Sequence, residues 1–392
     1  MSIGYIYFSF SNLLTIVWIC AGVAVAAMAW LLTVYAGRLN LISRHRAQSQ
    51  ARPEDSAYPP VSVIVHSRDN SRGLARILPQ ILGQEYPAAF EVIVINDGST
   101  SDTTDVVNLL ANTHKNLHIT FVPDKARNLS RKKLGISLGV KAASHPYVVL
   151  TTAECTIPSA TWLKAMATPF AQGFGVSLGT AHITGLKHAA DRFDMAQTEA
   201  IWLSAALSGH PYRGTGYNIG YKRELFFEAK GFSKSLTMRH GDDDLFIRQI
   251  VTPDNCAVVL TGDSIVEVNY SNPSRELNEM RLRHSFTARF LPHGSSRLFG
   301  FSSLMLWLWL AATVTGIVFS LPNALPGYIF LLLAVALWWL LGLSWRKTAD
   351  AMGIRLNAFT APWLMLWHWI RTLRYTLTCG RASRRNYTWL QR

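Results

Sequence analysis

Apolar and polar residues divide this chain into a long apolar run near its start, a mixed middle and a second apolar region near its end. Leu13–Ala36 is almost entirely apolar, and no charged residue comes before Arg38. Another stretch without charge extends from Leu298 to Trp345. Because about 20 apolar residues cross the hydrocarbon core as a helix, the first run predicts one membrane-spanning helix. The second predicts two, since the turn-forming residues of LPNALPG (321–327) interrupt it.

The middle of the chain alternates short β-branched runs with stretches of helical pattern. Four runs predict buried strands: VSVIVH (61–66), EVIVIN (91–96), HITFV (118–122) and YVVLT (147–151). Helices are predicted between them at 72–84, 102–113 and 131–144. This alternation indicates an α/β fold with a parallel, doubly wound sheet. Such sheets bind ligands at the carboxyl ends of their strands, which here are His66–Asn70, Asn96–Ser99 and Thr151–Cys155.

These patterns predict six segments along the chain. They are an N-terminal transmembrane anchor (1–37), a polar linker (38–59), an α/β domain (60–272), an amphipathic interfacial helix (273–297), two transmembrane helices (298–345) and a basic, Trp-rich interfacial segment (346–392). A cleaved signal peptide is the alternative for the first segment, but it needs a basic start and a shorter apolar core. The sequence therefore favours an uncleaved anchor.

Basic residues flank the predicted spans on one side only. The flanking residues are Arg38, Arg44 and Arg46 after the first span, Arg297 before the second, and Arg346 and Lys347 after the third. The turn at 321–327 carries no charge. Because Lys and Arg mark the cytoplasmic side, we expect residues 38–297 in the cytoplasm and the N-terminus outside. The sequence thus predicts a multi-pass protein of a bacterial-type inner (cytoplasmic) membrane.

The formal net charge of +14 also has a membrane explanation. The segment NAFTAPWLMLWHWI (357–370) is too short to span and rich in Trp, so it predicts an interfacial helix that contacts membrane lipids. Several arginines follow near anionic headgroups: Arg371, Arg374, Arg381, Arg384 and Arg385. Nucleic-acid binding is the competing explanation, and the placement of the charge next to the spans argues against it.

Three motifs of the middle region are candidates for ligand binding, and the lysine-containing one suits a phosphate. INDGSTSDTT (95–104) places Asp97 where the second strand ends, and NLSRKKLG (128–135) places Lys132 and Lys133 at a helix start. Cations and free backbone N–H groups act together at such a position. RGTGYNIG (213–220) is rich in glycine, but its spacing is neither that of a dinucleotide fingerprint nor that of a P-loop. Helix capping, a solvated basic face and a flexible turn are the structural alternatives.

Two further motifs suit acid–base chemistry near a membrane. RHGDDDLF (239–246) places three carboxylates side by side, so repulsion can raise the pKa of one of them and make it a general base. Acids in the first turn of a helix are the alternative, which accounts for one or two acids better than for three. SRELNEMRLRHSFTARF (274–290) predicts an amphipathic helix on the membrane surface, whose Arg283 and His284 face either the ligand or the lipid headgroups.

In this order, the motifs resemble those of the membrane-anchored family-2 glycosyltransferases over about residues 60–290. The resemblance implies a GT-A nucleotide-sugar-binding (Rossmann-like) domain at 60–272 and sugar transfer with inversion. VSVIVHSRDN (61–70) is similar to the family's opening strand, which implies a donor contact for Arg68. The next strand implies that Asp97 binds the nucleotide base or ribose. In KKLGISLGVKAA (132–143), Lys132 or Lys133 corresponds to the lysine near the diphosphate.

The resemblance also implies an acidic pair whose second member is the base. GDDDLF (241–246) is similar to this motif, and Asp242 and Asp243 align with the pair. Asp244 stays an alternative because the motif is one residue short before the leucine. By the same resemblance, GTGYNIGYKRELFFEAKGF (214–232) lines the donor-sugar and acceptor site, which implies contacts for Gly216 and Asn218.

Met280–His284 occupies the place of the Gln-x-x-Arg-Trp motif of processive polysaccharide synthases. Arg283 is kept and is the implied donor-binding residue, whereas Met280 replaces Gln and His284 replaces Trp. His284 is therefore a candidate for contacts with the acceptor. The two replacements weaken the case for a processive enzyme.

The stretch TTAEC (151–155) departs from the family pattern. An Asp-x-Asp pair there holds Mg²⁺ or Mn²⁺ against the donor diphosphate, but this chain has Thr152 and Glu154 in the two places. Mg²⁺ can bind through one carboxylate together with substrate phosphates. We therefore expect Glu154 to be a weakened metal ligand and Thr152 to contact the donor.

Together these observations predict a membrane-bound glycosyltransferase. It would move a sugar from a nucleotide-sugar donor to a lipid-linked or glycan acceptor in the synthesis of cell-envelope polysaccharide. A catalytically retired GT-A protein that binds glycan, nucleotide or a partner is the first alternative; TTAEC supports it and the intact GDDDLF argues against it. A processive polysaccharide synthase is the second, for which three spans are few.

Overall fold

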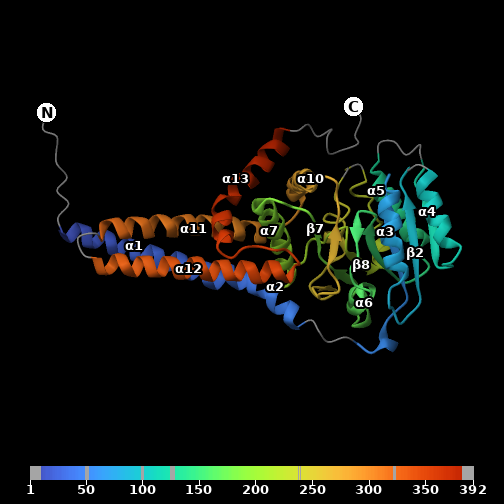
Figure 1. Ribbon diagram of the computed structural model, residues 1–392, viewed down its shortest axis with the longest axis horizontal. Coiled ribbons are helices and arrows are strands. Elements are labelled where there is room, and N and C mark those ends of the chain that lie inside the picture. The colour runs from blue at the N-terminus through green and yellow to red at the C-terminus, as the bar shows by residue number, and fades with distance from the viewer. Residues whose placement is uncertain are drawn as a thin grey trace.

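The computed structural model describes residues 10–48, 53–98, 101–123, 129–236, 238, 240–320 and 324–381. An α/β domain occupies one end of the molecule, and a bundle of long helices extends away from it (Figure 1). Several predicted features lie partly outside the described residues: the start of the anchor (1–9), part of the linker (49–52), Ser99 at the end of the second strand, Asn128 and Arg239 in two of the motifs, the turn at 321–323, and Arg384 and Arg385 near the C-terminus.

The main sheet has seven strands in the order β3-β2-β1-β4-β8-β6-β9. Their bounds are β1 Val61–Ser67, β2 Phe90–Asn96, β3 Leu117–Phe121, β4 Tyr147–Thr152, β6 Val176–Leu178, β8 Ile219–Lys222 and β9 Cys256–Val258. The four predicted strands are confirmed, and they pair in parallel. β8 was not predicted; it runs antiparallel to both β4 and β6. The chain leaves β1 toward β2 and later returns to β4, so the two halves of the parallel sheet diverge between β1 and β4, where such folds bind ligands.

A second, smaller sheet joins β5 Cys155–Thr156, β10 Val266–Val268 and β7 Ala181–Ile183. β5 follows β4 after a two-residue turn at Ala153–Glu154 and pairs antiparallel with β10. The backbone N–H of Asn269 donates to the carbonyl of Glu154 (2.9 Å). The TTAEC stretch is therefore held between the two sheets.

The three predicted helices of the domain are confirmed within two residues at each end: α3 Ser71–Leu82, α4 Ser101–Ala111 and α5 Arg131–Ala142. Asn70 caps α3 by accepting from the N–H of Gly73 (2.9 Å). α5 packs closely on the sheet because glycines face it: a Cβ at Gly139 would lie 2.9 Å from Cγ2 of Ile64. This close contact fixes the start of α5, and with it Lys132, at the sheet edge.

Further helices complete the domain: α6 Trp162–Ala171, α7 Ala189–Ala206, α8 Arg223–Glu228, α9 Ile247–Ile250 and α10 Pro273–Thr287. α7 lies between the α/β domain and the helical bundle (Figure 1). Most of its residues are buried, Asp194 and Glu199 among them. A helix that is buried all round lacks the one-sided apolar pattern that marks a surface helix, and the sequence did not predict it.

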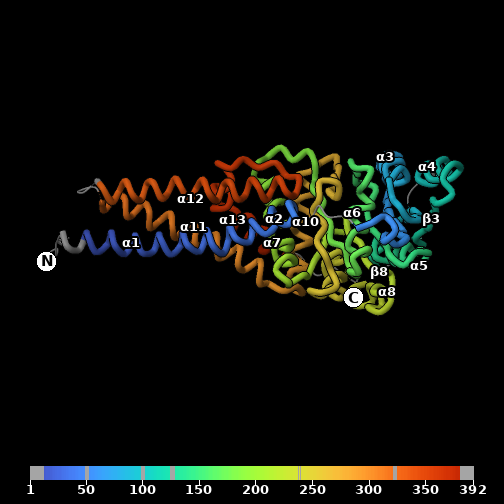
Figure 2. The backbone as a smooth tube through the Cα atoms, turned by 90° about the horizontal axis from the view of Figure 1, so that it is seen from below, coloured from blue at the N-terminus to red at the C-terminus, as the bar shows by residue number. Residues whose placement is uncertain are grey.

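In the part of the chain that the structure describes, three helices are long and apolar enough to span a membrane: Leu13–Gln48, Gly294–Phe319 and Leu325–Ala351. The first comprises α1 Phe10–Trp30, a π-helical turn η1 Leu31–Tyr35 and α2 Ala36–Gln48; the others are α11 Gly294–Phe319 and α12 Ala324–Ala351. α1, α11 and α12 run side by side away from the domain (Figure 2). The N-terminal helix continues past the predicted anchor because Leu39 and Ile42 are buried, so the first residues of the predicted linker at 38–59 are helical.

α13 Thr360–Arg381 is the last described helix and crosses the bundle near the domain (Figure 1). It exposes a row of large apolar side chains at helical spacing: Trp363, Trp367, Ile370, Leu373 and Leu377. An exposed apolar face next to spanning helices is typical of an interfacial helix. α10, predicted to lie on the membrane surface, packs against both α7 and α13.

Candidate active site

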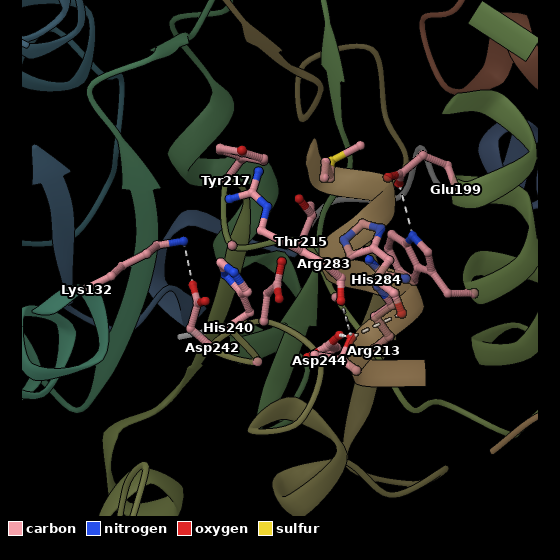
Figure 3. Close-up of a pocket in the computed structure, with 17 residues that line it drawn as sticks. Lys132, Glu199, Arg213, Thr215, Tyr217, His240, Asp242, Asp244, Arg283 and His284 are labelled. Atoms are coloured by element: carbon pink, nitrogen blue, oxygen red, sulfur yellow. Dashed lines mark hydrogen bonds and ion pairs between the residues drawn. The ribbon is translucent and has the colours of Figure 1, made fainter. Parts of the chain in front are cut away.

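A pocket opens where α5, α7, α10 and two loops meet. Its lining comprises Lys132, Glu199, Trp202, Arg213, Gly214, Thr215, Gly216, Tyr217, His240, Gly241, Asp242, Asp243, Asp244, Met280, Arg283, His284 and Thr287. The acidic motif, the glycine-rich loop and the altered Gln-x-x-Arg-Trp region were predicted separately, and the structure brings them to one place. Lys132 and Asp242 lie on one side of this pocket, with Arg213 and His284 on the other (Figure 3).

The three consecutive aspartates have different surroundings. Asp242 forms an ion pair with Lys132 (Oδ2 to Nζ, 2.5 Å). Burial raises the pKa of Asp242, but the charge of Lys132 outweighs it and holds that pKa below its usual range. Asp244 accepts from the Thr287 hydroxyl and from the N–H of Leu245 (2.7 Å), so its carboxylate fastens the loop to α10.

Asp243 is the aspartate suited to proton transfer. Burial together with the charges of Asp242 and Asp244 raises the pKa of Asp243 to about 6. Neighbouring carboxylates disfavour a further negative charge, and a general base works best when its pKa lies near the operating pH. The geometry therefore favours Asp243 over Asp242 and Asp244 as the candidate base.

Gly216 lets the glycine-rich loop approach this acidic group. A Cβ at Gly216 would lie 3.4 Å from Oδ2 of Asp242 and 3.5 Å from Nζ of Lys132. The contact predicted for Asn218 differs, because its side chain is fully buried outside the pocket. Its amide accepts from the Trp162 indole (3.0 Å) and donates to two backbone carbonyls, those of Thr180 and Ser264. Asn218 therefore holds the loop to the core, and its amide is occupied there.

The structure separates the two lysines that the sequence left as alternatives. Lys132 lines the pocket, whereas Nζ of Lys133 donates to the carbonyls of Ser235 (2.6 Å), His240 (2.7 Å) and Met238 (3.3 Å). Burial lowers the pKa of Lys133 to about 8. Lys133 therefore fastens the segment that precedes the aspartates, and Lys132 is the lysine available to a ligand.

Arg283 and His284 both line the pocket, which favours a ligand over the lipid headgroups as their partner. Arg283 lies near the hydrogen-bonded pair Tyr217–Tyr270 (hydroxyl to hydroxyl, 2.8 Å). Burial and the nearby charges of Arg213, Arg281 and Arg283 hold the pKa of His284 well below its usual range. His284 is therefore neutral at pH 7 and can accept as well as donate a hydrogen bond.

Glu199 on α7 also lines the pocket, and the sequence gave no sign of it. Burial raises the pKa of Glu199 to about 7, although Arg213 acts in the opposite direction. Its Oε2 accepts from the Trp202 indole N–H (3.1 Å). A carboxyl group with such a pKa is a candidate functional group. Only its buried position identifies it, because QTEA (197–200) matches no motif.

The remaining predicted residues lie at the ends of β1, β2 and β4, outside the residues that line this pocket. Asp97 accepts from Nε of Arg131 (2.7 Å) and pairs with Nε2 of His66 (3.3 Å). Burial raises the pKa of Asp97, but these two partners outweigh it and hold the pKa low. Arg68 is exposed in the turn after β1. These strand ends meet at one edge of the sheet, as a nucleotide-binding edge requires.

The TTAEC stretch offers one carboxylate. Glu154 is half-buried and accepts from Nδ2 of Asn70 (3.3 Å), while the Thr152 hydroxyl contacts Sγ of Cys155 (3.4 Å). Among the described residues, no three His, Cys, Asp or Glu side chains come together as a metal-binding group. Glu154 therefore fits a divalent cation only when other ligands, such as phosphate oxygens and water, complete the coordination.

The chain is similar to known glycosyltransferases, both in sequence and in structure. Residues 62–232 match the model of the family described as Glycosyl transferase family 2. A mannosyltransferase from Pyrobaculum calidifontis, PcManGT, solved with GDP-Man and Mn²⁺, is 18% identical with a TM-score of 0.51; the match covers 90% of this chain and 99% of that one. S. aureus TarS is 16% identical over 82% of this chain and 54% of that one, with a TM-score of 0.41. No curated protein sequence matches the chain significantly.

Proposed function

From the family 2 glycosyltransferase domain that this chain carries, we propose that the protein transfers a sugar from a nucleotide-sugar donor, with inversion, to a hydroxyl group of a lipid-linked acceptor. The observation that carries this proposal is Asp243, a half-buried carboxylate in the pocket whose pKa of about 6 sets it apart from its two neighbours. It stands in a pocket that also holds the cations Lys132, Arg213 and Arg283. A base beside several cations suits a reaction in which a hydroxyl attacks and a diphosphate departs.

The proposed step is a single displacement. The O–H bond of the acceptor breaks and its proton passes to Asp243. The acceptor oxygen bonds to the anomeric carbon of the donor. The bond from that carbon to the diphosphate oxygen breaks, and its electron pair leaves with the nucleoside diphosphate. One base suffices, because no carboxylate needs to form a covalent intermediate, unlike in retaining glycosidases.

The cations of the pocket stabilise the departing diphosphate in this proposal. Lys132 is held at the pocket wall by Asp242, and an ammonium group keeps further donors for a second partner. Arg283 offers a planar guanidinium suited to two phosphate oxygens at once. Fixed charges aimed at the position where negative charge develops lower the barrier because they need no reorganisation.

A divalent cation fits the proposal at Glu154. PcManGT binds its donor GDP-Man with Mn²⁺, and Glu154 occupies the sheet edge that carries Asp97 and Asn70 in this chain. Bound Mg²⁺ or Mn²⁺ would neutralise charge on the donor diphosphate. Because this chain supplies one carboxylate there, Lys132 and Arg283 carry more of that neutralisation than in an enzyme with two.

The lipid-linked acceptor is supported by the position of the pocket. α10 forms one wall of it and packs against α13, whose exposed apolar face is suited to the membrane interface. The positive flanks of the spans favour a cytoplasmic catalytic domain on a bacterial-type inner membrane. These features together favour a role in the synthesis of a cell-envelope glycan.

The test is an assay of the full-length protein with a panel of nucleotide sugars and a membrane lipid extract, with and without chelator. We expect one donor to release nucleoside diphosphate and to label a glycolipid with inverted anomeric configuration. Asp243→Asn should abolish the labelling, whereas Asp254→Asn, which alters an exposed aspartate, should leave it unchanged. Labelling by Asp243→Asn at the wild-type rate would contradict the assigned base, and no labelling with any donor would contradict the proposed function.

A further inference from the structure

A second, larger cavity lies between α7, α10, α11 and α13, with a volume of about 750 Å³. It adjoins the active-site pocket because Arg213 and His284 line both. We refer to it as the cationic cavity, since three arginines line it: Arg213, Arg281 and Arg289. None of the described lining residues is an Asp or Glu.

One of these arginines is already neutralised, because Nε of Arg281 pairs with Asp194 (3.1 Å). Nε2 of His368 contacts the same carboxylate (2.8 Å), and burial holds the pKa of His368 below its usual range. Arg213 and Arg289 form no ion pair with any described residue, although the charge of Arg213 acts on the nearby carboxyl groups of Asp243 and Glu199. An excess of positive charge in a cavity favours an anionic ligand.

The contacts of Arg289 and Arg213 leave donors for such a ligand. Arg289 lies over the ring of Phe286 (5.7 Å) and donates weakly to Sγ of Cys379 (3.7 Å), and both partners are uncharged. Nε of Arg213 is buried without an acceptor among the described residues. Buried donors are nearly always paired, so Nε of Arg213 points to a missing acceptor. A guanidinium fork matches the oxygens of a phosphate.

The other side of the cavity is apolar and belongs to the membrane part of the molecule. Phe299 lies in the second turn of the spanning helix α11, and Trp369 and Leu373 lie on the interfacial helix α13. Gly300 leaves room between them, because a Cβ at this position would have nothing within 4 Å. A ligand that fills both sides is therefore both anionic and apolar.

From this arrangement we propose that the cationic cavity binds the acceptor lipid, with its phosphate at Arg213 and Arg289 and the first part of its hydrocarbon chain against Phe299 and Trp369. This inference rests on the proposed function, because it names the class of acceptor as a phosphate-bearing lipid. The shared residues Arg213 and His284 place the cavity directly beside the active-site pocket. A hydroxyl group beyond the phosphate thereby reaches Asp243.

The binding test uses the full-length protein in detergent and three probes: farnesyl phosphate, farnesol and inorganic phosphate. Affinities are measured by native mass spectrometry or calorimetry. We expect farnesyl phosphate to bind at least tenfold more tightly than either other probe, because only it has both the charge and the chain. Equal affinity for farnesol would show a merely apolar groove, and equal affinity for inorganic phosphate a merely cationic patch; either result would overturn the proposal.

Two pairs of variants locate the binding. Arg289→Gln should weaken farnesyl phosphate binding about tenfold, the worth of one charge-assisted contact, while Arg297→Gln, also exposed on this side but outside the cavity, should not. Gly300→Leu should fill the cavity and weaken binding by a similar factor. Gly22→Leu is its control, because Gly22 also has open space and lies on the spanning helix α1. If the variant and its control weakened farnesyl phosphate binding equally in both pairs, the cationic cavity would not be the binding site.

Failure of this inference can be told apart from failure of the proposed function. If the protein labels a glycolipid while Arg289→Gln and Gly300→Leu leave both labelling and lipid affinity unchanged, the cavity is not the acceptor site and the transferase stands. If the variants lose farnesyl phosphate affinity but wild type releases no nucleoside diphosphate with any donor, the lipid site stands and the transferase does not.

Discussion

Asp194 on α7 is a buried carboxylate and Asp243 in the active-site pocket is a half-buried one, and the charges of their neighbours differ in sign. Asp194 is surrounded by donors: Nε2 of His368 (2.8 Å), Nε of Arg281 (3.1 Å), the hydroxyl of Tyr375 (3.3 Å) and Nη2 of Arg371 (3.8 Å). Burial raises the pKa of Asp194, but Arg281 and the other partners outweigh it and hold the pKa well below the usual range. Asp194 therefore remains charged and ties α7 to α10 and α13.

Asp243 has carboxylates on both sides in the chain, and the nearest cations are partly engaged elsewhere. Lys132 is paired with Asp242, so the pKa of Asp243 rises to about 6. The difference teaches that the partners, rather than burial alone, decide what a buried aspartate does in this protein. Surrounded by cations, it connects helices; beside other acids, it can exchange a proton near neutral pH.

The largest expected effect on the fold comes from Asp194→Asn. The change leaves Arg281 and Arg371 near a neutral amide, and removing one partner of a buried ion pair costs roughly 3–5 kcal/mol. We expect a clearly lower melting temperature in detergent. Asp350→Asn is the matched control, because Asp350 pairs with Arg346 on an exposed helix face at 3.9 Å, where such pairs contribute less than about 1 kcal/mol. Equal melting temperatures for the two variants would remove the structural role of Asp194.

The largest expected effect on activity comes from Asp243→Asn. Loss of a general base lowers the rate by about 10²–10⁴-fold. At pH 7 the same variant should be at least as stable as wild type, because it removes a carboxylate that its neighbours repel. Turnover and melting temperature, measured on the same samples, separate the two aspartates. If Asp243→Asn lost stability together with activity, Asp243 would have a structural role like that of Asp194.

The sequence predicted those parts of the fold that repeat a local pattern. β1 to β4 are short apolar runs that alternate with the helical patterns of α3 to α5, and the three spans are long apolar stretches without charge. Each of these elements could therefore be predicted without knowing its contacts in the folded protein. α7 was missed because it is buried on nearly all sides. The roles of Asp194 and Glu199 followed only from partners distant in sequence, such as Arg371 for Asp194.

The same limit applies within the candidate site. The spacing of GDDDLF indicated a base, but repulsion from both neighbours, which is read from the structure, selects Asp243. Lys132 and Lys133 are adjacent in sequence and start the same helix, yet successive helical residues point about 100° apart, so only one lines the pocket. Asn218 has the residue type of a sugar ligand, and its three core hydrogen bonds could not be inferred from the chain.

The pH dependence should differ in sign between activity and stability. The pKa of Asp243 is about 6 in the folded protein and about 3.9 when unfolded. Between these values the folded state binds more protons, so stability falls as pH rises through this range. Activity rises over the same range, because the base must be ionised, by up to about tenfold per pH unit below pH 6. We expect both trends between pH 5 and 7 in wild type, measured as kcat/KM and melting temperature.

Asp194 should contribute to neither trend. Its pKa is lowered in the fold, so its stabilising effect is complete above the unfolded pKa of about 3.9 and is lost only as pH falls below that value. Asp243→Asn should therefore reduce the change in stability between pH 5 and 7, to which Glu199 contributes with the same sign, and Asp194→Asn should leave the change in place. An unaltered slope in Asp243→Asn would assign the titration to another group, of which Glu199 is the nearest candidate, with a pKa of about 7.

The smallest expected effect concerns Glu154, a carboxylate with neither the cationic neighbours of Asp194 nor the acidic neighbours of Asp243. The Glu154 side chain forms no ion pair with any described residue, and it accepts a hydrogen bond from the amide of Asn70 at 3.3 Å. Its remaining lone pairs are free for a cation that phosphates help to hold. We expect Glu154→Gln to lower activity about tenfold, the worth of one charged contact near 1.4 kcal/mol, and to lower sensitivity to chelator. Glu85→Gln, an exposed glutamate on the same domain, should change neither. If Glu154→Gln retains both activity and chelator sensitivity, the diphosphate depends on Lys132 and Arg283, and any metal is held elsewhere.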